Sequence, residues 1–440
     1  MDPLTIGILM FISLIILILI GHPLAFIFGE LATFFGLIFW GPNVFPIFMN
    51  RIYGNMSDFI LLAITLFIFM GNLLSSSGIA DGLFAALRQV IGKITGGLGV
   101  AVILICILFA ACTGVVGASV VTMGLLAGPI LLKYGYQKAL TTGIIGAGGT
   151  LGILIPPSIM LVIMGAQSNQ SVGKLFMAAV IPGLILGFMY VTYVILRCEL
   201  NPKLGPPMQK EEIDKISVKK RIRDLFVYAI PPILLILAVL GSIFTGIATP
   251  TEASGVGAFI TLLMMVLYGK FSWKTLKDAV YETAKTTTMV IFMLTTASCF
   301  TAVFLGLGCG DAIIKVILAI GFGKWGTLFL MLGLLVILGC FIDWIAIVLI
   351  TFPIFLPVVN AIGFNELWFI ALCAITLQTS FLTPPFGYAL FYIFGLRLPG
   401  VTQGDVIRGN LPFVPLIITV ILLVIIFPQL TLWLPGLMIK

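Results

Sequence analysis

The sequence predicts an all-α polytopic membrane protein with two inverted repeats, each of about five transmembrane helices and one re-entrant hairpin. Its 440 residues are 61% hydrophobic and 9% charged, and several apolar runs are long enough to cross a bilayer. Two pairs, Pro156-Pro157 and Pro384-Pro385, interrupt apolar segments 228 residues apart, about half the chain. One long polar stretch, 197–224, separates halves of similar size. A duplicated plan follows from these observations.

The first half contains five predicted crossings. They cover residues 4–20, 23–40, 58–78, 139–165 and 174–197. The first run follows Met1-Asp2-Pro3 without a basic segment or a small-residue cleavage site, which favours a retained span over a signal peptide. The segment near 43–57 is either an interfacial helix or a polar connector. The apolar stretch 97–132 is too long for one crossing and is broken near Thr113-Gly114, so we expect a re-entrant hairpin.

The second half repeats this order. Its crossings are predicted at 228–248, 252–269, 287–308, 366–395 and 411–437. A stretch at 271–286 has a rough apolar stripe, which predicts a helix at the membrane interface. The apolar stretch 325–362 is broken between Gly339 and Asp343, and it is the second expected hairpin.

The distribution of basic residues predicts which side of the membrane each loop occupies. Eighteen of the 23 Lys and Arg residues fall on one side, which the positive-inside rule makes cytoplasmic. The exceptions are Arg51, Lys174, Lys315, Lys324 and Lys440. Both termini are then on the outer side of the membrane, and the net charge of +7 reflects orientation in the lipid bilayer, with no nucleic acid as partner.

Five crossings in each half are an odd number, so the second copy must be inverted relative to the first. We divide the chain into a first repeat at 1–200, a cytoplasmic linker at 201–225 and a second repeat at 226–440. The hairpin at 97–132 enters from the cytoplasm, and the hairpin at 325–362 enters from outside. This arrangement is typical of secondary transporters that bind substrate between their repeats.

This chain lacks the motifs that several classes of enzyme require. There is no GxxxxGK[ST] phosphate loop, and the one histidine, His22, belongs to no metal-binding pattern. The seven cysteines are scattered and form no CxxC pair. We therefore expect no enzymatic activity and no organic cofactor.

The first candidate site combines the first hairpin with the first broken span. The hairpin carries Thr113, Gly114 and Ser119, and the span carries Gly149 and Thr150 before Pro156 and Pro157. Unwound helices expose carbonyls that suit sodium and amides that suit a carboxylate. We expect Na⁺ near Ser119 and Thr150. The alternative is that these small residues serve only close helix packing.

The second copy favours the site interpretation. Asp343 lies at the hairpin break, and the broken span carries Thr379, Ser380 and Thr383 before Pro384 and Pro385. We expect a second Na⁺ near Asp343 and Thr379. An acid inside a membrane is usually functional, but Asp343 could equally cap the helix that follows it.

Thr249-Pro250-Thr251-Glu252 predicts a capping box that opens the span at 252–269. The whole stretch 246–258 (GIATPTEASGVGA) also resembles the signature of the large membrane (M) subunit of tripartite ATP-independent periplasmic (TRAP) transporters. The resemblance extends over nearly the entire chain and includes Phe341-Ile342-Asp343, Pro353 through Pro357, Ile155 through Ser158 and Thr383 through Gly387. At the first hairpin tip, Thr113 through Val116 replace the more serine-rich tip that is usual there.

The resemblance implies sodium-driven import of an organic acid, such as a C4-dicarboxylate or a sialic acid, with Na⁺ as the coupling ion. It implies two protein partners, a periplasmic substrate-binding (P) protein and a small membrane (Q) subunit. It also implies an elevator mechanism, in which the hairpins, the broken spans and the spans at 58–78 and 287–308 move against a scaffold. The alternatives are a stand-alone sodium/dicarboxylate symporter of the divalent-anion type, a channel, and an intramembrane enzyme.

Overall fold

The computed structural model describes residues 1–114, 116–209, 211, 217–319, 321–385 and 387–438, leaving the side chains at 110–113 and 318 outside the description. Every regular element in these ranges is a helix. Ten helical stretches are long and apolar enough to cross a membrane. They include one arm of each hairpin, Val116–Lys133 and Trp344–Ala361, whereas the two broken spans fall into shorter helices.

The first half is a run of helices that matches the predicted order. It comprises α1 (Pro3–Ile20), α2 (Leu24–Trp40), α3 (Val44–Met56), α4 (Phe59–Ser76), α5 (Ile79–Ile91), α6 (Gly97–Thr113), α7 (Val116–Lys133), α8 (Lys138–Thr150), α9 (Ile159–Ser168) and α10 (Val172–Leu200). The segment that could have been a polar connector is the helix α3. Helices α6 and α7 form the expected hairpin, and α8 and α9 form the broken span, with the short 3₁₀ turn η2 (Leu151–Ile153) between them.

The second half repeats these elements. It comprises α12 (Val218–Phe244), α13 (Pro250–Leu267), α14 (Trp273–Gly306), α15 (Cys309–Ala319), α16 (Gly323–Gly339), α17 (Trp344–Ala361), α18 (Glu366–Leu382), α19 (Tyr388–Gly395), α20 (Gln403–Asn410), α21 (Val414–Ile426) and α22 (Gln429–Gly436). Helices α16 and α17 are the second hairpin, and α18 and α19 are the second broken span.

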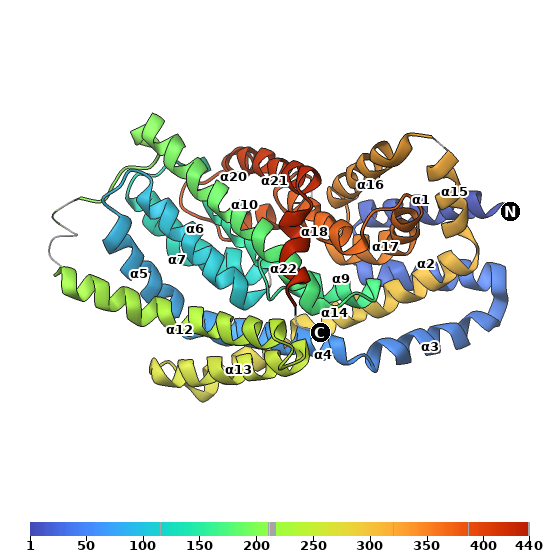
Figure 1. Cartoon of the computed structure of the whole chain (residues 1–440), viewed down its shortest axis with the longest axis horizontal. Coiled ribbons are helices and arrows are strands. Elements are labelled where there is room, and N and C mark those ends of the chain that lie inside the picture. The colour runs from blue at the N-terminus through green and yellow to red at the C-terminus, as the bar shows by residue number, and fades with distance from the viewer. Residues whose placement is uncertain (115, 210, 212–216, 320, 386, 439–440) are drawn as a thin grey trace.

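The two hairpins lie toward opposite ends of the molecule's long axis (Figure 1). The pair α6–α7 lies near α5, and the pair α16–α17 lies near α15 and the N-terminus. Outward faces of the spans are apolar: Phe188 of α10 is 70% exposed and Phe259 of α13 is 61% exposed. Such faces suit lipid as the surrounding solvent, in agreement with a multi-pass membrane protein.

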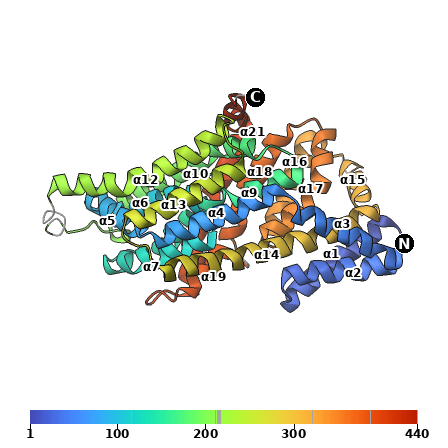
Figure 2. The ribbon, with the colours of Figure 1, turned by 90° about the horizontal axis from the view of Figure 1, so that it is seen from below.

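Three predicted boundaries were wrong. Helix α12 begins at Val218, inside the segment predicted as linker, because the Ser217 hydroxyl accepts a hydrogen bond from the Lys220 backbone N–H and caps the helix. The stretch predicted as a separate interfacial helix at 271–286 is continuous with the following span in the 34-residue α14, which runs along much of the molecule in Figure 2. No helix breaker separates the two parts.

The third wrong boundary concerns the last crossing, predicted at 411–437. The helical run begins earlier, at α20, where Thr402 and Asp405 form a capping box, and it ends at Ile426. Phe427 leaves the helical conformation because Pro428 follows it. The remaining short helix, α22, packs against α10. Helices α5 and α15 were not predicted, although Ile79, Leu83 and Leu87 form an apolar stripe that α5 buries.

Candidate functional site

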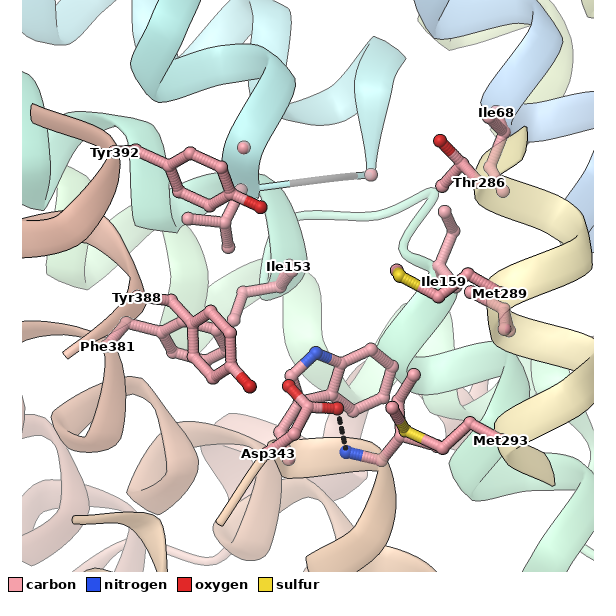
Figure 3. A pocket seen from close by; sticks show the side chains of 16 residues that line it. Ile68, Ile153, Ile159, Thr286, Met289, Met293, Asp343, Phe381, Tyr388 and Tyr392 are labelled. Atoms are coloured by element: carbon pink, nitrogen blue, oxygen red, sulfur yellow. Dashed lines mark hydrogen bonds between the residues drawn. The ribbon is translucent and has the colours of Figure 1, made fainter. Parts of the chain in front are cut away.

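The tips of both hairpins and the breaks of both interrupted helices surround a cavity of about 210 Å³ (Figure 3). Helices α4 and α14 complete its wall. The lining residues are Gly114, Val116 and Gly117 of the first hairpin; Asp343, Trp344 and Ile345 of the second; Ile153 and Ile159 at the first break; Phe381, Tyr388 and Tyr392 at the second; and Ile68, Thr286, Met289, Val290 and Met293 of α4 and α14.

Four helices begin at this cavity. Val116, Ile159, Trp344 and Tyr388 are the first residues of α7, α9, α17 and α19, and all four line it. A helix start carries unpaired backbone N–H groups and the positive end of the helix dipole. The convergence of four starts therefore makes a site that favours an anion.

Asp343 is the acidic side chain of this cavity. It is 8% exposed and caps α17, because its Oδ2 accepts a hydrogen bond from the Ile345 backbone N–H at 3.2 Å. The capping interpretation is thus confirmed, and the same carboxylate also lines the cavity. The Tyr388 hydroxyl of α19 points toward this carboxylate and interacts with it (Figure 3). Asp343 consequently joins the second hairpin to the second broken span.

The predicted residues of the first repeat lie close together at the hairpin and the break. Gly114 has a φ of +61°, and a Cβ there would stand 3.4 Å from the Pro157 carbonyl oxygen, so the hairpin tip lies against the break. A Cβ on Gly149 would stand 3.1 Å from the Cα of Val120, the residue after Ser119. The end of α8 therefore packs directly on α7.

The polar side chains of that group are buried. Ser119 is 1% exposed and Thr150 is fully buried. The Thr150 hydroxyl donates to the Ala147 carbonyl oxygen at 2.8 Å. The Thr113 side chain lies outside the described residues. Of this group, Gly114 lines the cavity.

The second repeat brings its predicted residues together in a corresponding way. A Cβ on Gly339, the last residue of α16, would stand 1.8 Å from the Ser380 Oγ of α18. The Thr379 hydroxyl donates to the Thr376 carbonyl oxygen at 2.7 Å, and the Thr383 hydroxyl donates to the Thr379 carbonyl oxygen at 2.9 Å. The hairpin end and the broken helix are therefore in close contact.

Polar atoms beside this contact have no partner within the described part of the chain. They are the Ser380 Oγ and both amide atoms of Gln378, all buried on α18. Buried polar atoms without partners are rare, so a cluster of them suits an ion or water. Thr379, Ser380 and Thr383 lie behind the cavity wall rather than in it.

Neither proline pair lines the cavity. Both Pro-Pro peptide bonds are cis. Pro156-Pro157 stand directly before Ser158, whose hydroxyl accepts from the Leu161 backbone N–H and starts α9. Pro384-Pro385 line a separate hollow together with Leu390 and Phe394 of α19. Both pairs interrupt their helices, as predicted, and the residues just after them begin the half-helices that reach the cavity.

Several lining residues were not predicted from the sequence. Thr286, Met289 and Met293 share one face of α14, and Tyr388 and Tyr392 share one face of α19, at helical spacing. That spacing groups them, but it does not say which face meets the hairpins. Tyr392 also links the repeats, because a Cβ on Gly117 of the first hairpin would stand 2.7 Å from its ring.

A polytopic helical protein whose half-helices converge on an internal cavity belongs to the class of membrane transport permeases. This chain belongs to the TRAP transporter family: the family model for the tripartite ATP-independent periplasmic transporter, DctM component, matches residues 11–430. It is a transporter permease component, not an enzyme. Family membership therefore identifies the chain as a TRAP large subunit and excludes the alternative of a stand-alone symporter.

Curated relatives agree with this assignment. The chain is 31% identical to the C4-dicarboxylate TRAP transporter large permease protein DctM of Pseudomonas aeruginosa, with 91% of this chain and 92% of that protein covered. It is 30% identical to the sialic acid TRAP transporter large permease protein SiaM of Vibrio cholerae, with 96% of each covered. It is 28% identical to the isethionate TRAP transporter permease protein DctMQ of Oleidesulfovibrio alaskensis, covering 95% of this chain and 65% of that longer protein.

Among solved structures, the YdaH transporter of Alcanivorax borkumensis has the same fold. Its TM-score is 0.64 at 16% sequence identity, and the match covers 96% of this chain and 98% of that one. At this identity the likeness supports the architecture alone.

Proposed function

We propose that this chain imports an organic acid together with Na⁺ across a bacterial inner membrane, with both of its termini in the periplasm. The observation that carries the proposal is the convergence of four helix starts on the cavity, since these suit a carboxylate. Relatives named for C4-dicarboxylate and sialic acid transport support an organic acid as the substrate.

Na⁺ is the proposed coupling ion, bound at the contacts between hairpin and broken helix. One position is near Ser119 and Thr150, and the other is near Asp343 and Thr379. Buried hydroxyls and the carbonyls at helix ends provide oxygen ligands there. Each net positive charge that enters contributes about 2.3 kcal/mol per 100 mV of membrane potential, so an excess of Na⁺ over substrate charge concentrates the acid without ATP.

Membership of a tripartite family implies two partners, a periplasmic substrate-binding protein and a small membrane subunit. We propose that the binding protein delivers the acid and that the small subunit braces the scaffold. The longer isethionate permease is named DctMQ, which combines the letters of the large and the small subunit. This name supports a small membrane partner for the present chain.

An elevator motion is the proposed route across the membrane. The hairpins and broken helices would move and carry their side of the cavity, while α1, α2, α12 and α13 stay fixed. The family resemblance implies that the spans at 58–78 and 287–308 belong to the moving part. Helix α4 packs extensively on α13, and α14 packs extensively on α2. We therefore propose that α4 and α14 belong to the fixed part instead.

Uptake by proteoliposomes tests the proposal. The large and small subunits are reconstituted together, and uptake of a radiolabelled acid is followed with and without the binding protein and an inward Na⁺ gradient. We expect uptake only when both subunits, the binding protein and the gradient are present. Uptake by the large subunit alone, from free substrate and without dependence on Na⁺, would contradict the proposal.

A further inference from the structure

The cavity has two chemically different sides (Figure 3). The Asp343 carboxylate and the hydroxyls of Tyr388 and Tyr392 lie on one side. Met289 and Met293 of α14 lie across from them, with Ile68 of α4 beside Thr286. A bound molecule would therefore meet a carboxylate and two phenol hydroxyls on one side and, apart from the Thr286 hydroxyl, thioether and aliphatic groups on the other.

Apart from the proposed Na⁺ ions, positive charge for an anion comes from the helix starts. Among the described residues that line the cavity there is no Lys, Arg or His. One carboxylate can lie at the converging helix starts. A second carboxylate would have to lie against the apolar wall, where it would lose hydration and gain no opposite charge, or near Asp343, where it would compete with that carboxylate for the proposed Na⁺.

A polyhydroxylated acid fits the cavity poorly as well. Buried hydroxyls need hydrogen-bond partners, and the methionine wall provides only the Thr286 hydroxyl and weakly accepting thioethers. The cavity volume of about 210 Å³ lies below the roughly 300–1,000 Å³ of typical small-molecule pockets. A small acid with a short body suits it best.

We propose that the transported acid is a monocarboxylate with a short apolar body, such as a branched-chain acid. Its carboxylate lies at the starts of the half-helices, and its body lies against Met289, Met293 and Ile68. This inference rests on the proposed function and narrows it to a substrate unlike the dicarboxylate, sialic acid and isethionate for which the relatives are named.

Direct binding tests the inference without the selectivity of the binding protein. The full chain, purified with its small subunit, is titrated calorimetrically in saturating NaCl with isovalerate, succinate and N-acetylneuraminate. Isovaleramide has the same body without the charge and serves as the ligand control. We expect isovalerate to bind with a Kd at least ten-fold below those of the other three.

Two variants locate the body of the ligand. Met293→Gln places an amide in the apolar wall and should weaken isovalerate binding about ten-fold. Met49→Gln makes the same change at an exposed methionine of α3 outside the cavity and is the matched control, with a Kd within about three-fold of the unmodified chain. If Met293→Gln does not fold, the ligand panel on the unmodified chain still decides.

The outcomes separate this inference from the proposed function. Succinate or N-acetylneuraminate binding as tightly as isovalerate would overturn the apolar monocarboxylate and leave organic-acid transport intact. Isovaleramide binding as tightly as isovalerate would overturn the carboxylate position. Binding of no acid at any Na⁺ concentration would overturn both the inference and the proposed site.

Discussion

At the scale of single residues, Thr150 and Thr379 lie in similar places, although the 228-residue spacing of the two breaks pairs Thr150 with Gln378. Each lies in the last turn of the helix that ends at a break, and each hydroxyl donates to a carbonyl of its own helix. Donation fixes the direction of the hydroxyl hydrogen and leaves the oxygen lone pairs directed away from it. Such oxygens are suited to a cation that lies between the broken helix and the hairpin.

Thr150→Val, Thr379→Val and Asp343→Asn test the sodium positions. Valine keeps the volume of threonine and removes the oxygen, and asparagine keeps the cap of α17 and removes the charge. We expect each variant to raise the Na⁺ concentration for half-maximal uptake by about ten-fold, the effect of losing one charge-assisted contact.

Thr261→Val of α13 is the matched control for these variants. Thr261 is fully buried, and its hydroxyl donates to the Gly257 carbonyl oxygen at 2.8 Å within its own helix, far from either hairpin in sequence. Its sodium dependence should not change. Unchanged dependence in all three test variants would refute the proposed sodium positions while leaving family membership in place.

At the scale of helices, the second hairpin depends on close contact between α16 and α18. A side chain at Gly339 would overlap Ser380, whose Oγ stands 1.8 Å from the position of a Cβ. Gly333 lies one turn and a half earlier in α16, and a Cβ there meets nothing within 4 Å. The two glycines therefore separate the effect of the contact from that of helix propensity.

Gly339→Ala should destabilise the protein by about 1–3 kcal/mol through overpacking and should abolish most uptake. Gly333→Ala should be neutral or stabilising by up to about 1 kcal/mol, because alanine favours the helix. Thermal unfolding of both variants in detergent, together with uptake in proteoliposomes, measures the difference. Equal melting temperatures for the two variants would contradict the close contact.

At the scale of the whole molecule, helix order and charge predict one arrangement in the membrane. Gly173 at the start of α10 lies next to Ile243 at the end of α12 and to Met438, so the end of the chain lies beside these helix ends. The basic residues Lys219, Lys220, Arg221 and Arg223 lie at the other end of α12. The positive-inside rule places that end in the cytoplasm.

Reporter fusions test this arrangement. Alkaline phosphatase fused after Lys440 should be active, because that enzyme is active in the periplasm, and green fluorescent protein fused there should be dark. Green fluorescent protein inserted after Asn201 should be fluorescent. The reverse pattern at both sites would invert the predicted orientation, and reporters on the same side would contradict an odd number of crossings between Asn201 and Lys440.

The sequence by itself determined the class of the protein, its internal repeat and the places where its helices are broken. Apolar runs fix crossings because backbone polar groups must pair inside lipid, and proline fixes breaks because it lacks a backbone donor. Thus the hairpin tips at Gly114 and Asp343 and both interrupted helices were predicted near their positions in the structure. Residues 246–258 also indicated the family that the comparisons confirmed.

Tertiary structure decided which side chains meet. Tyr388, Tyr392, Met289 and Met293 lie on helical faces that the sequence can group, but only the packing of α14 and α19 against the hairpins turns those faces toward the cavity. The start of α20 and the end of α21 depended on a capping box and on Pro428, local signals that an apolar run conceals. Hydropathy records burial in lipid or protein alike, so it locates helices without telling which neighbours they face.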